Sequence, residues 1–147
     1  MFSRIVVGTD GSETASEAVR QATDLAKQTG AELDIVSAFE PIAQSRLREE
    51  RVDAPADIAH TIGPSEDVDG MLAQAANAVE KEGVKVSTFA RQGDPADAIL
   101  DLAEERNADL IIVGNKGMTG AKRFLLGSVP NKVSHHAPCS VLIIRTT

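Results

Sequence analysis

The stretch RIVVGTDGSETASEAV, Arg4 to Val19, combines three signals that together favour an α/β fold. Its β-branched run ends at Gly8 and predicts a short strand, and TDGS is typical of a turn. Apolar residues then recur at helical spacing until Gly30, which stands where a helix C-cap is expected. The next segment, AELDIVSAF from Ala31 to Phe39, predicts a second strand. A strand, a helix and a second strand form the repeating unit of a parallel sheet.

The remainder of the chain repeats this alternation. Further strands are predicted at Val84 to Ala90, Leu110 to Gly114 and Val141 to Ile144. Helices are predicted from Ser65, from Asp94 as N-cap with Pro95 at the first turn, and near Ser128 to Ser134, whereas residues 41–64 predict a loop. We therefore expect one domain over residues 1–147. Its fold is an open five-stranded parallel sheet of order 3-2-1-4-5 with helices on both faces, a Rossmann-like α/β architecture.

The last predicted strand, Val141 to Ile144, lies at an edge of this sheet. Its sequence VLII is fully apolar, and an exposed apolar edge invites pairing with another chain. We predict a homodimer that forms through this strand. The alternative is that a helix or the carboxyl tail covers the edge.

The distribution of charge bears on the partners of the chain. Residues 1–109 carry all 22 acidic residues and ten of the 15 basic ones, whereas residues 110–147 carry five basic residues and no acidic one. An acidic body without Trp or Tyr argues against nucleic acid as a partner. No apolar run is long enough for a membrane span, and no secretory signal is evident. Because Cys139 is the only cysteine, no intrachain disulfide can form, and we expect a cytoplasmic protein.

Two glycine-bearing turns follow the strands that flank the predicted reversal of strand order. They are GTDGS, Gly8 to Ser12, and GNKG, Gly114 to Gly117. Ligands of open α/β sheets bind at this point, and glycine lets backbone N–H groups approach a phosphate. Gly127 and Ser128 precede a predicted helix, whose amino end also attracts anions. The sequence therefore predicts a site for a small anion.

The spacing of Gly114, Gly117, Gly127 and Ser128 follows the pattern G-x2-G-x9-G-(S/T). In this pattern, and along its length, the chain resembles the ATP-binding branch of the universal stress protein family, which shares the fold of adenine nucleotide alpha-hydrolases. The resemblance implies dimers through the last strand and a role as sensor or effector in stress adaptation. It also implies nucleotide contacts at a set of residues. These are Thr9, Asp10 and Ala38 near adenine and ribose, with Gly8 in the turn before them, Val113 in the pocket wall, and Gly114, Gly117, Gly127, Ser128 and Val129 near phosphate.

Two departures from the family pattern leave the choice of nucleotide open. Pro130 stands where some ATP binders have a hydroxyl residue, and Gly8 stands where others have proline. The GSVP variant also resembles members that prefer cyclic AMP. The expected cofactor is therefore ATP, with Mg²⁺ if the triphosphate is intact, or cyclic AMP. A slow ATPase or self-phosphorylating enzyme is a further alternative, with Ser128 as acceptor, although Asp10 is the only carboxylate that the pattern places in the site.

Several residues also allow simpler interpretations. Asp10 could only cap the first helix, and Lys116, Lys122 and Arg123 could form a solvated basic loop or attract phosphate. His135, His136 and Cys139 do not predict a metal site, because adjacent histidines point in different directions and no fourth ligand is near. Cys139 is expected to be a small buried side chain at the start of the last strand.

Overall fold

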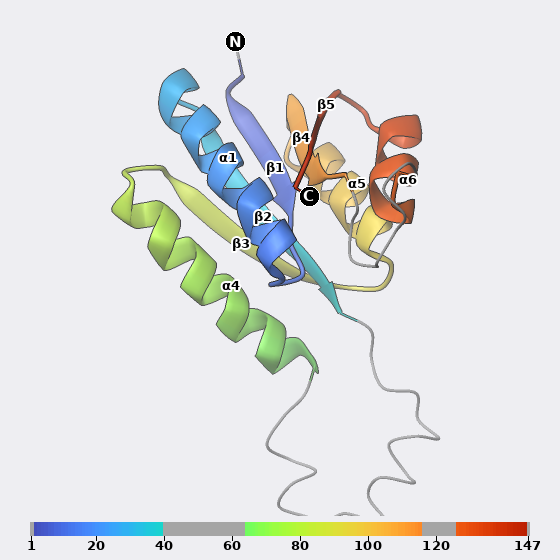
Figure 1. Ribbon diagram of the computed structural model, residues 1–147, viewed down its shortest axis with the longest axis horizontal. Helices are drawn as coiled ribbons and strands as arrows, with labels where there is room; N and C mark the ends of the chain where they lie inside the picture. Colours follow the sequence, from blue (N-terminus) through green and yellow to red (C-terminus); the bar gives the residue numbers. More distant parts are fainter. Residues whose placement is uncertain (1, 40–63, 116–125, 147) are drawn as a thin grey trace, which may run out of the picture.

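The computed structural model describes residues 2–39, 64–115 and 126–146. Its five strands form one parallel sheet in the order β3-β2-β1-β4-β5, as predicted (Figure 1). The strands are β1 (Arg4–Gly8), β2 (Glu32–Phe39), β3 (Val86–Gln92), β4 (Leu110–Gly114) and β5 (Ser140–Ile144). The predicted loop at residues 41–64 lies outside the described residues, except for its last residue. The order reverses between β1 and β4, where the sequence predicts the ligand site.

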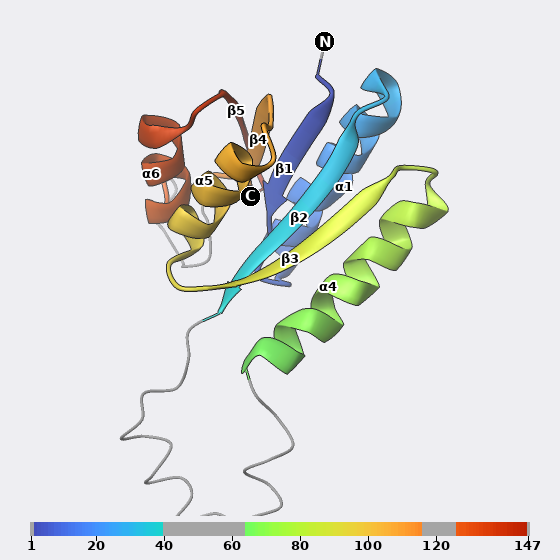
Figure 2. The same ribbon diagram turned by 180° about the vertical axis from the view of Figure 1, so that it is seen from behind.

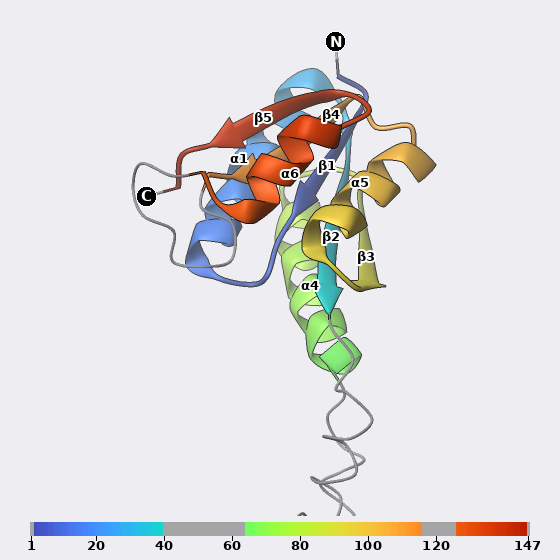
Figure 3. The same ribbon diagram turned by 90° about the vertical axis from the view of Figure 1, so that its right-hand side faces the viewer.

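The described helices cover both faces of the sheet. One face carries α1 (Glu13–Thr29) and α4 (Pro64–Lys81), and the other carries α5 (Pro95–Glu105) and α6 (Ser128–His136). Figures 2 and 3 show α5 and α6 side by side. Each face has its own apolar core, the first around Ile5, Val7 and Leu33 and the second around Val6 and Ile111. Among the described residues, no helix combines the length and apolarity needed to cross a bilayer.

Local signals place the helix ends. Gly30 adopts the left-handed conformation at the end of α1, with φ of 74°, and Asp94 caps α5 by accepting a hydrogen bond from the Asp97 N–H group. The interpretation of Asp10 as a helix cap is wrong. Ser12 caps α1, because its hydroxyl accepts from the Ala15 N–H group, and Asp10 instead accepts from the Ser12 N–H group at 2.9 Å within the turn.

Several predicted boundaries need correction. β2 begins at Glu32 rather than Ala31, and β5 begins at Ser140 rather than Val141. The strand predicted at Val84 to Ala90 begins and ends two residues later, because its pairing with β2 runs from Leu33 opposite Val86 to Phe39 opposite Gln92. The helix predicted from Ser65 begins one residue earlier, at Pro64, a residue that suits the first turn because its missing N–H group needs no partner there. The last helix continues two residues beyond Ser134 to His136.

Side chains close the amino end of the sheet with a network of ion pairs. The buried carboxylate of Asp34 on β2 lies 3.1 Å from the guanidinium of Arg4 and 3.1 Å from that of Arg106, at the end of α5. Arg4 also pairs with Glu32, which pairs with Lys85 at 3.0 Å. The hydrogen bonds with Asp34 raise the pKa of Arg106. All four of these interactions join segments that are distant in sequence.

The edge strand β5 leaves apolar side chains in contact with solvent. Leu142 is 42% exposed and Ile143 is 37% exposed. Within the described part of the chain, neither a helix nor the carboxyl tail buries these two side chains. The homodimer through this strand stays a prediction, and the exposed edge is the surface on which it depends.

Candidate functional site

The turn after β1 is held by hydrogen bonds to its own backbone and to β2. Thr9 is buried, its N–H group donates to the Val36 carbonyl at 3.0 Å, and its hydroxyl accepts from the Gly11 N–H group at 3.1 Å. Gly11 has φ of 82°, a conformation that disfavours other residues. Asp10 is exposed. The turn is therefore fixed in shape while the Asp10 side chain is accessible from solvent.

A small cavity of about 20 Å³ lies where the ends of β1 and β4 meet α6. It brings together four of the predicted site residues, Gly8, Val113, Gly114 and Val129. Its other lining residues are Thr14, Ala15, Ile99, Pro130 and Thr146. Sequence reasoning named Pro130 as a departure from the family pattern but missed the remaining four. For Thr146, the pairing of β4 with β5 is the signal that would have placed the carboxyl tail beside Gly114.

Gly8 faces a close approach of α5. A Cβ atom at this position would lie 2.6 Å from Cδ1 of Ile99, a distance that packed carbon atoms do not adopt. Ile99 is buried and fills the space that the glycine leaves. Some relatives are expected to have proline at the Gly8 position. Here the small size of glycine leaves room for the large Ile99 side chain on α5.

The start of α6 offers backbone donors toward this cavity. Gly127 is the N-cap, and among the described residues no side chain caps this helix. The N–H groups of Ser128 and Val129, in the first turn, have no partner within the helix, and Pro130 has no N–H group at all. The Gly127 N–H group donates to the Asn115 carbonyl at 3.0 Å. The helix therefore presents two backbone donors, together with the exposed Ser128 side chain.

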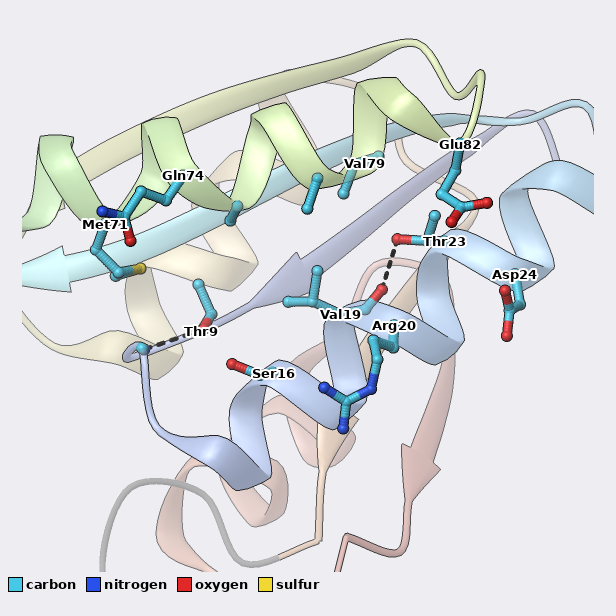
Figure 4. A pocket seen from close by; sticks show the side chains of 13 residues that line it. Thr9, Ser16, Val19, Arg20, Thr23, Asp24, Met71, Gln74, Val79 and Glu82 are labelled. Atoms are coloured by element: carbon cyan, nitrogen blue, oxygen red, sulfur yellow. Dashed lines mark hydrogen bonds between the residues drawn. The ribbon is translucent and has the colours of Figure 1, made fainter.

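Other predicted residues are not gathered at this cavity. Thr9 lines a separate groove of about 530 Å³ between α1 and α4, with Val19 and Arg20 on one side and Met71 and Val79 on the other (Figure 4). Ala38 is half-buried on β2 and packs against the core under α5 and α6. Gly117 and the basic residues Lys116, Lys122 and Arg123 lie outside the described residues.

The carboxyl-terminal His and Cys side chains have other surroundings. Among residues 2–39, 64–115 and 126–146, no three His, Cys, Asp or Glu side chains gather as metal ligands would. The rings of His135 and His136 are 6.4 Å apart and tilted by 55°. Cys139 is half-buried, immediately before β5, and packs against the core under α5 and α6. Burial raises the pKa of its thiol, so it is not an activated nucleophile.

Comparison with known proteins decides the family. A sequence model described as the Universal stress protein family matches residues 1–145. The chain belongs to the universal stress protein family.

Several universal stress proteins resemble this one over nearly its full length. Universal stress protein YxiE of Bacillus subtilis is 34% identical over 148 residues, covering 99% of this chain and all of the relative. Universal stress protein Rv1636 of Mycobacterium tuberculosis is 35% identical over 147 residues, covering 99% and 98%. A crystal structure of a universal stress protein in complex with cAMP superposes with a TM-score of 0.71 at 31% identity, covering 99% of this chain and 98% of that one. The family predicted from the glycine spacing and from the resemblance along the chain is thereby confirmed, whereas its ATP-binding branch stays a prediction.

Proposed function

We propose that this universal stress protein binds an adenine nucleotide at the carboxyl ends of β1 and β4. The observation that carries the proposal is the meeting of Gly8, Val113, Gly114 and Val129 around one cavity at the reversal of strand order. The similar protein whose structure contains cAMP supports the chemical class of the ligand. The cavity, at about 20 Å³, is smaller than a nucleotide, so it would enclose only part of the ligand.

The phosphate group is expected at the amino end of α6. The N–H groups of Ser128 and Val129, which have no partner within the helix, and the positive end of the helix dipole favour a negative charge there. Residues 110–147 add a local excess of positive charge in a chain with net charge −7. Together with Gly117, which completes the glycine spacing, these features support phosphate contacts from Gly114, Gly127 and Ser128. Contacts from Thr9, Asp10 and Ala38 to the nucleoside are supported by the family resemblance alone, because none of the three lines this cavity.

ATP and cyclic AMP are the two candidate ligands. The complete G-x2-G-x9-G-S spacing supports ATP, and Mg²⁺ would then accompany the triphosphate, with the exposed Asp10 as the candidate carboxylate to hold it. Pro130 favours cyclic AMP, because it removes the third backbone donor of α6 and a cyclic monophosphate carries fewer oxygens and less charge than a triphosphate. The solved cAMP complex favours the same candidate.

Titration calorimetry with ATP, ADP, cyclic AMP and GTP tests the proposal directly. We expect at least one adenine nucleotide to bind and GTP to bind more weakly. Titrations of ATP with and without Mg²⁺ decide whether the metal belongs to the complex. Mass spectrometry of small molecules that copurify with the native protein gives an independent readout. If none of the adenine nucleotides binds, the proposed function is wrong.

The enzymatic alternative, a slow ATPase or self-phosphorylating protein, depends on a residue that could activate an attacking group. In the described β1–α1 turn, the only carboxylate before the helix is Asp10, which accepts the Ser12 N–H group. We expect bound ATP to be released intact. Turnover that disappears in Asp10→Asn, or phosphate that appears on Ser128, would favour the enzyme instead.

As a working unit, we propose a cytoplasmic homodimer of a single 147-residue domain, acting as a sensor or effector in stress adaptation. The exposed Leu142 and Ile143 on β5 support pairing of two copies through this edge. The single cysteine suits a reducing compartment. Sedimentation equilibrium should give a dimer that Leu142→Lys weakens, whereas a monomer at every concentration would exclude this assembly.

A further inference from the structure

Asn115, directly after β4, connects three segments of the site. Its N–H group donates to the Ile144 carbonyl at 2.8 Å, which extends the pairing of β4 with β5. Its own carbonyl accepts the Gly127 N–H group at 3.0 Å, next to the start of α6. Its side-chain oxygen Oδ1 accepts two further hydrogen bonds from Thr146, from the N–H group at 2.9 Å and from the hydroxyl at 3.2 Å.

These contacts divide into two independent sets. The backbone of Asn115 serves the sheet and the start of α6, and any amino acid other than proline could make both of these hydrogen bonds. Among the described residues, the Asn115 side chain bonds to the carboxyl tail, through Thr146. Replacing the side chain therefore removes both hydrogen bonds to Thr146 and leaves the backbone connections of the site in place.

The tail lies against the predicted phosphate site. A Cβ atom at Gly114 would lie 3.3 Å from Cγ2 of Thr146, so the Thr146 methyl group occupies the space beside the first glycine of the spacing pattern. Thr146 also lines the small cavity together with Gly114 and Val129. The last described residue of the chain is thus one wall of the cavity in which we place the nucleotide.

We propose that Asn115 is a positioning residue, which anchors the carboxyl tail at Thr146 as a wall of the nucleotide site and thereby sets the affinity for the nucleotide. This inference rests on the proposed function. A segment that leaves an edge strand frays unless it is tied down, and here both Asn115 hydrogen bonds tie Thr146 to the residue after Gly114. An anchored wall keeps water away from the bound phosphate, whereas a free tail must be ordered again at each binding event.

The test compares Asn115→Ala with Asn77→Ala, a matched change at an exposed position of α4. Affinity for ATP and cyclic AMP is measured by calorimetry, and exchange of the Thr146 amide hydrogen is measured by NMR. We expect Asn115→Ala to weaken binding of the preferred nucleotide about tenfold, as the loss of two neutral hydrogen bonds allows. Amide exchange at Thr146 should accelerate in this variant. Asn77→Ala should match the original protein in both measurements.

A conservative variant separates positioning from a general loss of structure. Asn115→Asp retains an oxygen that can accept both hydrogen bonds from Thr146, but it adds a negative charge next to the phosphate site. We expect it to bind adenosine, which has no phosphate, as the original protein does, and to bind ATP more weakly. Asn115→Ala should also bind ATP more weakly but, unlike Asn115→Asp, it should lose the slow exchange of the Thr146 amide. A structural defect would not produce this difference between ligands.

Two results would overturn the inference. One is that Asn115→Ala binds nucleotide as the original protein does, while its Thr146 amide exchanges faster. The other is that exchange of the Thr146 amide hydrogen is unchanged in Asn115→Ala.

If Asn115→Ala fails to fold, a chain that ends at Arg145 removes the same wall and must bind nucleotide more weakly for the inference to stand. Failure of the proposed function looks different, since the original protein would then give no binding heat with any adenine nucleotide, and the inference would fail with it.

Discussion

The two ends of the parallel sheet are closed in opposite ways. At the amino end, charged side chains from distant segments meet around the buried carboxylate of Asp34. At the carboxyl end, glycines, short turns and the start of α6 leave backbone groups facing a small cavity. The difference indicates that the amino end stabilises the fold and the carboxyl end is available for a ligand. Substitutions at the two ends should therefore separate stability from binding.

The largest effect on stability is expected from Asp34→Ala. The change leaves Arg4 and Arg106 without their shared carboxylate. Breaking a buried ion pair costs about 3–5 kcal/mol, and we expect the lower end of that range because both arginines reach solvent. Urea denaturation measures the loss, and nucleotide affinity of the folded fraction should be unchanged.

Asp101→Ala is the matched control, because Asp101 is exposed on α5. Its stability should differ from the original by no more than about 0.5 kcal/mol. If Asp34→Ala were as stable as this control, the ion-pair network would not be the stabilising element of the amino end.

The next largest effect on stability is expected at Gly8, which packs against α5 and also lines the candidate cavity. Gly8→Ala places a methyl group against Ile99, and we expect a loss of about 1–3 kcal/mol from overpacking. Ile99→Val removes Cδ1, the atom nearest to the added methyl group. As a single change it should cost about 0.5–1.5 kcal/mol of stability. The double variant should be more stable than Gly8→Ala alone, as thermal unfolding can measure. If the stability losses of the two single variants simply added in the double variant, the close approach of Ile99 would not be the cause of the Gly8→Ala loss.

Ser128→Ala should affect binding and leave stability nearly unchanged. Ser128 is exposed and is not the cap of α6, since Gly127 has that position. Loss of a hydrogen bond to a charged phosphate corresponds to at least about a tenfold weaker affinity for the preferred nucleotide. Ser134→Ala, on the same helix, is the control and should bind as the original does. Equal affinities for both variants would remove Ser128 from the phosphate site.

The smallest effect concerns pH and Asp109, which also belongs to the amino end. Burial raises the pKa of this carboxyl. Hydrogen bonds from the N–H groups of Ser3 and Arg4 lower the pKa and together outweigh burial, so the folded-state pKa lies below the usual value. The carboxylate therefore stabilises the fold above the unfolded-state pKa of about 4, and this contribution disappears as pH falls through the folded-state pKa.

Asp109→Asn tests this contribution. The variant should be less stable than the original at pH 7, and the difference in urea midpoint should shrink below about pH 4. A difference that stays constant across this range would assign the effect to packing rather than to charge.

The sequence predicted the sheet well because its strands carry their own signals. β1 and β4 are continuous apolar runs and were placed at their observed bounds. β3 was misplaced by two residues, because alternation from Val84 onward does not show where pairing with β2 begins. Val84 itself is buried without belonging to the strand. Hydrogen-bond register depends on the neighbouring strand, which local patterns do not contain.

The candidate site was less predictable, because half of its lining comes from residues with ordinary local roles. Glycine spacing identified Gly114 and Gly127, since glycine is informative where a backbone approaches closely. Ile99 looked like any apolar residue of a helix, and Asn115 and Thr146 carry no local signal. Their roles arise only when β5 pairs with β4 and brings the carboxyl tail beside Gly114. Such contacts between distant segments require the tertiary structure.

The strand order has a consequence for how the chain folds during its synthesis. β4 lies between β1 and β5, so β1 has no neighbour on that side until residues 110–114 have left the ribosome. By then the earlier strands, α1, α4 and α5 have all been made. During this interval Ile5, Val6 and Val7 form an uncovered parallel edge in the middle of the future sheet. Nascent chains arrested before β4 emerges should therefore recruit chaperones more strongly than chains that already contain it.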